Sequence, residues 1–180
     1  MATVLVPLAT GFEEIEAVTV IDILRRGGVS VRVAGVDALA VTGAHAITVQ
    51  CDALLAETDV KTLDGIMLPG GMPGTRNLLK NSFLRELIIQ LDREELLLAA
   101  ICAAPIVLHA AGVLKGKKAT SYPGFNKEMA DAVYSVDPVV ADGNIITSRA
   151  AGTAVPFALR VLEQLAGRDT AQEVKKAIIA

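Results

Sequence analysis

The stretch LLLAAICAAPIVLHAAG, residues 96–112, contains a complete junction between a strand and a helix. Its first part, Leu96–Ile101, is wholly apolar, which is typical of a strand buried on both faces of a parallel sheet. Pro105 suits the first turn of a helix, where no backbone N–H is needed, and a helical pattern then continues to Leu114. Cys102 therefore lies where a buried strand passes into a helix.

The rest of the chain predicts an alternation of strands and helices. The expected strands are Thr3–Leu8, Val29–Val36, Leu63–Gly71, Leu96–Ile101 and Lys118–Tyr122, with hairpins at Leu39–Cys51 and Asp137–Ser148 that turn near Gly43–His45 and at Asp142–Gly143. The expected helices are Glu13–Gly28, Asn81–Glu95, Ala104–Leu114, Gly152–Gly167 and Thr170–Ala180. We expect Ser82 to cap the second helix, and Ile15, Val18 and Ile21 to share one side of the first. This order predicts one doubly wound α/β domain, residues 1–180, with a mostly parallel sheet, helices on both faces and added β-hairpins.

Composition limits the classes of function. Hydrophobic residues make up 52% of the chain and aromatic residues 3%, so the core must be aliphatic. The net charge is −3 and the longest basic cluster is Lys115–Lys118, which argues against binding of nucleic acid. No run of about 18 apolar residues is present, so no membrane contact is expected. The first residues lack the pattern of a secretion signal and Cys51 and Cys102 are unsuited to a disulfide, so we expect a cytoplasmic protein.

Three segments are expected at the carboxyl edge of the sheet, where such folds place their sites. They are ATGFEE (residues 9–14), PGGMPG (residues 69–74) and CAAP (residues 102–105), and each follows a predicted parallel strand. The sharp turn after the last of these strands resembles a nucleophile elbow, which lifts a side chain out of the core. Free N–H groups at the start of the helix would favour a thiolate at Cys102, and the amide of Ala103 could bind an oxyanion. The alternative is that Cys102 is a small buried apolar residue, and the motif alone does not separate the two.

Acidic and glycine residues in the other two segments could complete such a site. Glu16 lies one turn inside the first helix, where its carboxyl can face the site; if buried it would tend to be protonated and could donate to the thiolate. Gly70 and Gly71 allow a close approach of the backbone to a ligand and offer a second N–H to an oxyanion. The alternative for the acidic residues is the ordinary preference of carboxylates for a helix N-terminus. The alternative for Gly70 and Gly71 is an ordinary turn, in which Pro-Gly-Gly is common.

Four motifs in this order, GFEEIEAV (residues 11–18), LPGG (68–71), AAICAAP (99–105) and ITSRAAGTAVPFAL (146–159), resemble the ThiJ/PfpI superfamily. The likeness covers nearly the whole chain and is strongest to the branch that contains the parkinsonism-associated protein deglycase and its bacterial homologues. It implies a flavodoxin-like fold without a cofactor, and a homodimer in which the first helix contributes to the interface. It also implies a catalytic pair of Cys102 and Glu16, with the amides of Gly71 and Ala103 as oxyanion donors.

The resemblance implies two kinds of function. The first is cysteine-dependent processing of reactive aldehydes: glutathione-independent conversion of methylglyoxal to lactate, or removal of early glycation adducts from proteins and nucleotides. Cys102 would form a hemithioacetal and Glu16 would move a proton between adjacent carbons. The alternative is an oxidative-stress sensor or chaperone in which the same thiol is oxidised to a sulfinate without turnover. The sequence does not select among glyoxalase, deglycase and sensor.

This chain departs from some relatives around the predicted site. Ala103 follows the cysteine where members of the protease branch have His, and Ala150–Ala151 precede Gly152 where others have Gly-Pro. Tyr122 stands where some relatives have His; it could hydrogen-bond a substrate oxygen but accepts protons poorly at neutral pH. Arg149 could hold an anion or a carbonyl near the site, or form a structural salt bridge.

Only two histidines are present, which limits the mechanisms that the chain can support. His109 lies about 10 Å along the helix from Cys102, too far for direct proton transfer. His45 falls at a predicted hairpin turn and is expected to be exposed or at a dimer contact. No His follows residue 109, which disfavours a class I glutaminase and a cysteine protease. No pair of His or Cys residues has the spacing of metal ligands, so we expect no metal site.

Overall fold

The computed structural model describes residues 1–180 and contains a seven-stranded sheet in the order β10-β11-β7-β6-β1-β2-β5. The strands of this sheet are β1 Thr3–Leu8, β2 Ser30–Gly35, β5 Ala53–Leu54, β6 Gly65–Leu68, β7 Leu97–Ile101, β10 Val139–Asp142 and β11 Ile145–Ser148. Every neighbouring pair is parallel except β10–β11. The expected mostly parallel sheet with an antiparallel hairpin at its edge is therefore confirmed.

Six α-helices accompany the sheet: α1 Glu14–Arg26, α2 Gly74–Lys80, α3 Ser82–Arg93, α4 Pro105–Ala110, α5 Ala154–Ala166 and α6 Arg168–Ala177. Four short 3₁₀ turns cover residues 55–57, 60–62, 125–128 and 151–153. Two small sheets lie outside the main one, the antiparallel hairpin of β3 Ala40–Thr42 with β4 Thr48–Gln50, and the parallel pair of β8 Lys118–Ala119 with β9 Val133–Tyr134. No helix combines the length and the apolar character that crossing a membrane requires.

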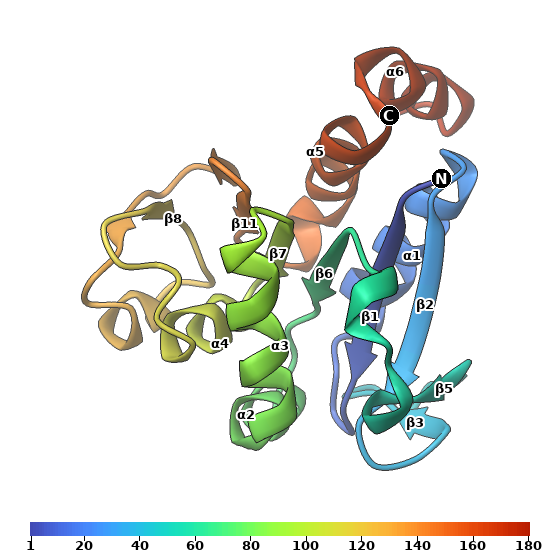
Figure 1. Ribbon diagram of the computed structural model, residues 1–180. Helices are drawn as coiled ribbons and strands as arrows, with labels where there is room; N and C mark the ends of the chain where they lie inside the picture. Colours follow the sequence, from blue (N-terminus) through green and yellow to red (C-terminus); the bar gives the residue numbers. More distant parts are fainter.

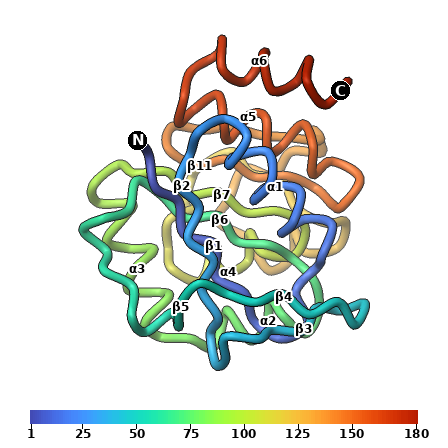
Figure 2. The backbone as a smooth tube through the Cα atoms, turned by 90° about the vertical axis from the view of Figure 1, so that its right-hand side faces the viewer, coloured from blue at the N-terminus to red at the C-terminus, as the bar shows by residue number.

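Alternation along the central strands divides the core into two layers. Val4 and Val6 of β1 point into one layer with α1 and α5, while Leu5 between them points into the other with α3 and α4. The helices consequently cover both faces of the sheet (Figure 1). This two-residue period in a sheet buried on both faces explains why the strands read as continuous apolar runs. α6 lies outermost, beyond α5 as seen from the sheet (Figure 2).

Helix α1 buries only part of the apolar side that the sequence shows. Its buried stripe contains Ala17, Val20 and Leu24, whereas Ile15 and Val18 are 58% and 47% exposed. Spacings of three and four residues place the three buried side chains on one side of the helix. Of the residues expected to share one side, Ile15, Val18 and Ile21, only Ile21 is buried, because apolar residues lie on more than one side of this helix.

Three details of the other helices also differ from expectation. The side chain of Asn81, not that of Ser82, caps α3 by accepting a hydrogen bond of 2.9 Å from the amide of Leu84. Helix α4 ends at Ala110 rather than at residue 114, and Gly112 with a φ of +80° follows it, as is common beyond a helix end. Helix α2 was not predicted, because its seven residues are too few to show a helical period.

Candidate active site

The three segments predicted at the carboxyl edge of the sheet lie in contact. The amide of Glu13, after β1, donates to the carbonyl of Gly70, after β6, at 2.9 Å. The amide of Gly74 donates to the carbonyl of Gly11 at 3.1 Å, which joins the same two segments a second time. Gly70 also lies directly against Cys102, after β7. The parallel strands thus bring together residues from three distant parts of the sequence.

Cys102 occupies a strained turn between β7 and α4. Its φ of +64° lies in the left-handed region that non-glycine residues rarely adopt. Two backbone hydrogen bonds hold it there: its amide donates to the carbonyl of Ser148 at 2.9 Å, and its carbonyl accepts from the amide of Tyr122 at 2.8 Å. The side chain remains partly exposed. The turn therefore lifts the thiol out of the strand and fixes its direction, as expected of an elbow.

The carboxyl group of Glu16 is completely buried beside the thiol. Its Oε2 atom accepts a hydrogen bond of 2.8 Å from the amide of Gly70, while its Oε1 atom has no hydrogen-bond partner. Burial raises the pKa of Glu16 from 4.5 to about 7, and hydrogen bonds from Gly70 and Cys102 act against this rise. The expected burial of this carboxyl, with a proton retained toward neutral pH, follows from its position.

Glu16 and Cys102 influence each other's ionisation. Burial, the charge of Glu16 and the hydrogen bond to it together raise the pKa of the Cys102 thiol to about 12, although the amides of Ala103 and Gly71 act to lower it. Two acidic groups buried side by side lose their first proton far more easily than their second. With pKa values of about 7 at Glu16 and about 12 at Cys102, the pair carries one negative charge between these values, and Glu16 holds it. The expectation that the start of the helix favours a thiolate was wrong, because burial and the neighbouring carboxylate outweigh the amides of Ala103 and Gly71. A thiolate forms when Glu16 takes the proton of the thiol.

Glycine is required at both positions after β6 for steric reasons. A Cβ atom on Gly70 would lie 2.6 Å from Cβ of Cys102 and 2.7 Å from Oε2 of Glu16. Gly71 has a φ of +90°, and a Cβ there would lie 2.4 Å from the amide nitrogen of Glu13. Without these side chains the loop approaches so closely that the amide of Gly71 faces the sulfur and the amide of Gly70 reaches Glu16.

The two remaining predicted residues lie at the edge of this arrangement. Tyr122 is 47% exposed, and its ring meets that of Phe125 edge to face with 6.5 Å between centroids. The guanidinium of Arg149 forms no ion pair; it donates to the carbonyl of Val136 at 2.8 Å. Arg149 thus fastens the segment before β10, and contact of either side chain with a substrate stays a prediction.

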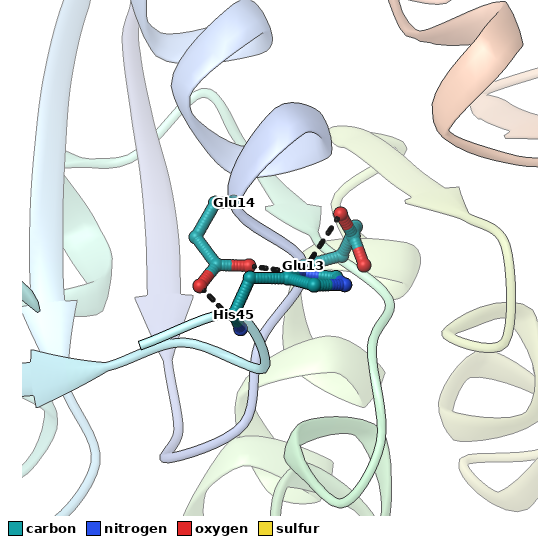
Figure 3. Close-up of side chains that lie close together, drawn as sticks. All are labelled: Glu13, Glu14 and His45. Carbon is teal, nitrogen blue, oxygen red and sulfur yellow. Dashed lines mark hydrogen bonds and ion pairs between the residues drawn. The ribbon is translucent and has the colours of Figure 1, made fainter. Parts of the chain in front are cut away.

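A polar contact that the sequence did not indicate lies beside the site. Glu14 is buried, and its carboxylate accepts hydrogen bonds from the amides of His45 and Ile47 and lies 2.9 Å from Nδ1 of His45 (Figure 3). Burial acts to raise the pKa of Glu14, but these hydrogen bonds outweigh it and hold the pKa at about 2. The residues are 31 positions apart, so no local spacing could reveal the contact. His45 is exposed, as expected at the hairpin turn, and His109 is half-buried on α4.

Comparisons with known proteins identify the family and agree with the fold. The profile of the DJ-1/PfpI family matches residues 2–164. Protein dj-1beta of Drosophila melanogaster is 41% identical, with 97% of this chain and 95% of that protein covered. The crystal structure of Drosophila DJ-1beta superposes with a TM-score of 0.96 at 40% identity, covering 99% of this chain and 98% of the other.

Two further relatives show how the family varies. Protein DJ-1 homolog A of Arabidopsis thaliana is 40% identical over 98% of this chain, but the chain spans only 46% of its length, about half. A protein of Caenorhabditis elegans that is named glutathione-independent glyoxalase DJR-1.2 is 34% identical, with 92% of this chain and 89% of that protein covered. The matched profile, the whole-length relatives and the superposed fold lead to one conclusion: this chain is a member of the DJ-1/PfpI family.

Proposed function

We propose that this protein removes small reactive aldehydes such as methylglyoxal, with Cys102 as the nucleophile and Glu16 as the acid and base. The observation that carries the proposal is the contact between a thiol on a strained elbow and a fully buried carboxyl with one unpartnered oxygen. The name of the C. elegans relative, a glutathione-independent glyoxalase, supports the substrate class. The reaction requires no metal or organic cofactor.

The first steps follow from the positions of the groups. Glu16, as a carboxylate, takes the proton of the Cys102 thiol, and the sulfur attacks the aldehyde carbon so that a C–S bond forms. The amides of Gly71 and Ala103, which face the sulfur, stabilise the developing oxyanion. Glu16 gives its proton to that oxygen, which yields a hemithioacetal and leaves Glu16 as a carboxylate.

The later steps use the same carboxylate. Glu16 removes the proton from the carbon bonded to sulfur and returns it to the neighbouring carbon, so that the hemithioacetal becomes a thioester of lactate. Water then cleaves the C–S bond, lactate leaves, and the thiol is restored. The balance is one methylglyoxal and one water to one lactate, with no net oxidation. Early glycation adducts in equilibrium with the same aldehyde would be processed through the same hemithioacetal.

We further propose that the protein acts as a homodimer with α1 at the interface. Three apolar side chains are each about half exposed: Ile15 and Val18 on α1, and Ile47 between β3 and β4. Covering side chains of this size with a second subunit would lower the free energy. A Val18→Asp change should shift the species seen by analytical ultracentrifugation from dimer to monomer. A monomer in the unchanged protein would contradict this part of the proposal.

The decisive experiment measures methylglyoxal loss and lactate formation without glutathione. The unchanged protein should turn over many times, Cys102→Ser should not, and Glu16→Gln should lose about 10²-fold or more in kcat. Cys51→Ser is the matched control, because that thiol lies away from the elbow in the core beside Asp52, where burial raises its pKa. No turnover by the unchanged protein would reject the enzyme. Addition of two oxygens to Cys102 under mild peroxide, seen by intact mass, would then favour an oxidant sensor.

A further inference from the structure

A second group of side chains with ligand chemistry lies outside the Cys102 site. Glu13 and Glu14 at the start of α1 and His45 at the turn of the β3–β4 hairpin point toward one another (Figure 3). Nδ1 of His45 lies 2.9 Å from Oε2 of Glu14 and 3.6 Å from Oε1 of Glu13. One ligand atom from each of the three residues lies within 4.8 Å of the other two. The proposed aldehyde chemistry uses none of these three side chains.

The separations suit a small divalent cation. Bonds of about 2.0–2.2 Å from zinc to nitrogen or oxygen in a tetrahedral site place neighbouring ligand atoms about 3.4 Å apart. The distances from Nδ1 to the two carboxylates lie on either side of this value. Movement of about half an ångström by the exposed imidazole brings these two distances to it. The oxygens of Glu13 and Glu14 lie within 4.8 Å of each other, so Glu13 must turn toward the cation.

The surroundings hold one ligand in place ahead of binding. Glu14 is only 5% exposed, and its Oε1 atom accepts from the amides of His45 and Ile47 at 2.7 and 3.3 Å. These bonds leave Oε2 directed at the imidazole. Hydrogen bonds of this kind to a ligating carboxylate are the outer contacts that orient metal ligands. Glu13 has no other side-chain partner than His45, so it is free to turn toward a cation.

We propose that Glu13, Glu14 and His45 form a binding site for a divalent cation of the zinc type. One imidazole and two carboxylates are the mixed nitrogen and oxygen set that Zn²⁺ and Co²⁺ accept, whereas Mg²⁺ and Ca²⁺ prefer oxygen alone. Three protein ligands leave a fourth position for water. The cation would bridge α1 and the hairpin and would replace the hydrogen bond between His45 and Glu14.

The test must separate this site from the thiol, because Cys102 with Glu16 is a competing set of ligands. Isothermal titration with ZnCl₂ is therefore carried out on the full-length chain carrying Cys102→Ser. One equivalent should bind, and the added changes His45→Ala and Glu13→Gln should each weaken binding about tenfold or more. His109→Ala is the matched control, since it removes the other histidine of the chain and should leave the affinity unchanged.

A spectroscopic measurement checks which atoms bind. Co²⁺ added to the Cys102→Ser protein should give visible bands of nitrogen and oxygen coordination, and these should be lost in His45→Ala. Glu14 is left unchanged in all variants because its carboxylate holds the hairpin, and far-UV circular dichroism confirms folding of each. If His45→Ala folds poorly, Glu13→Gln still decides. Absence of saturable one-to-one binding would overturn the proposal. So would an affinity in the His45→Ala and Glu13→Gln variants equal to that of the Cys102→Ser protein.

Discussion

Replacing Glu16 by Gln should stabilise the folded protein at alkaline pH while leaving its stability at acidic pH nearly unchanged. The carboxyl is completely buried and one of its oxygens has no partner, so its negative charge is poorly solvated in the folded state. In the unfolded chain the same charge is in water. Glutamine keeps the shape of the side chain and the hydrogen bond from Gly70 but cannot ionise.

The size of the effect follows from the pKa of Glu16, which burial raises from 4.5 to about 7. At 1.36 kcal/mol for each pKa unit, this rise corresponds to about 3 kcal/mol of stability lost on ionisation. Below pH 4.5 the carboxyl is neutral in both states, so nothing is lost. Between 4.5 and about 7 the unfolded chain releases its proton first and stability falls; above about 7 the loss is complete. A loss of this size is a large part of the roughly 5–15 kcal/mol that stabilises a typical domain.

The measurement is urea unfolding of both proteins at about pH 4 and about pH 8.5, at one protein concentration and with a chelator present. Any fixed cost of the glutamine amide contributes equally at both pH values and cancels in the comparison. The difference between the proteins should grow by about 3 kcal/mol from acid to alkaline pH, in favour of glutamine. Glu86→Gln, at an exposed position on α3 without an ion pair, should show no such growth. A constant difference for Glu16→Gln would refute the reasoning.

Two further changes test the packing around the site and the capping of a neighbouring helix. Gly70→Ala should lower the free energy of unfolding by about 1–3 kcal/mol and reduce turnover, because the new Cβ atom would press on the thiol and the carboxyl. Gly152→Ala is the control: the space around Gly152 is open, so this change should affect neither quantity. Asn81→Ala should cost about 1 kcal/mol in urea unfolding and Ser82→Ala almost nothing, since only the first side chain caps α3; equal costs would reject that assignment.

The sequence predicted the main sheet well because a central strand shows two signals: a run of apolar residues, and a change of residue type where the strand ends. Leu96–Ile101 is apolar throughout and is followed at once by Cys102 and a proline, so both the strand and its end were visible. The structure places β7 within that range, with its last residue at Ile101. The elbow at Cys102 could therefore be located from local pattern alone, and so could the approach of the Gly70 segment, which follows from the topology of parallel strands.

Features that depend on contacts between distant elements could not be predicted in the same way. The sequence of α1 has apolar residues on more than one side, and only the docked helix shows that Ala17 and Val20 face the sheet while Ile15 does not. The contact of Glu14 with His45 joins a helix to a hairpin 31 residues away. The unpartnered oxygen of Glu16 is likewise a property of the assembled site, because the sequence shows a carboxyl but not what surrounds it.

The chemistry proposed for Glu16 and the stability of the fold make opposite demands on the same carboxyl. A glutamate in water, with its pKa near 4.3, would be ionised at neutral pH and could not give a proton to an oxyanion. Burial beside Gly70 and Cys102 raises the pKa to about 7, where one group can both give and take a proton. The same burial lowers the free energy of unfolding above neutral pH, because the ionised carboxylate is poorly solvated in the folded protein. Glu16→Gln should therefore be more stable and less active than the unchanged protein at alkaline pH. A carboxyl with only a packing role would show the gain in stability without the loss of turnover.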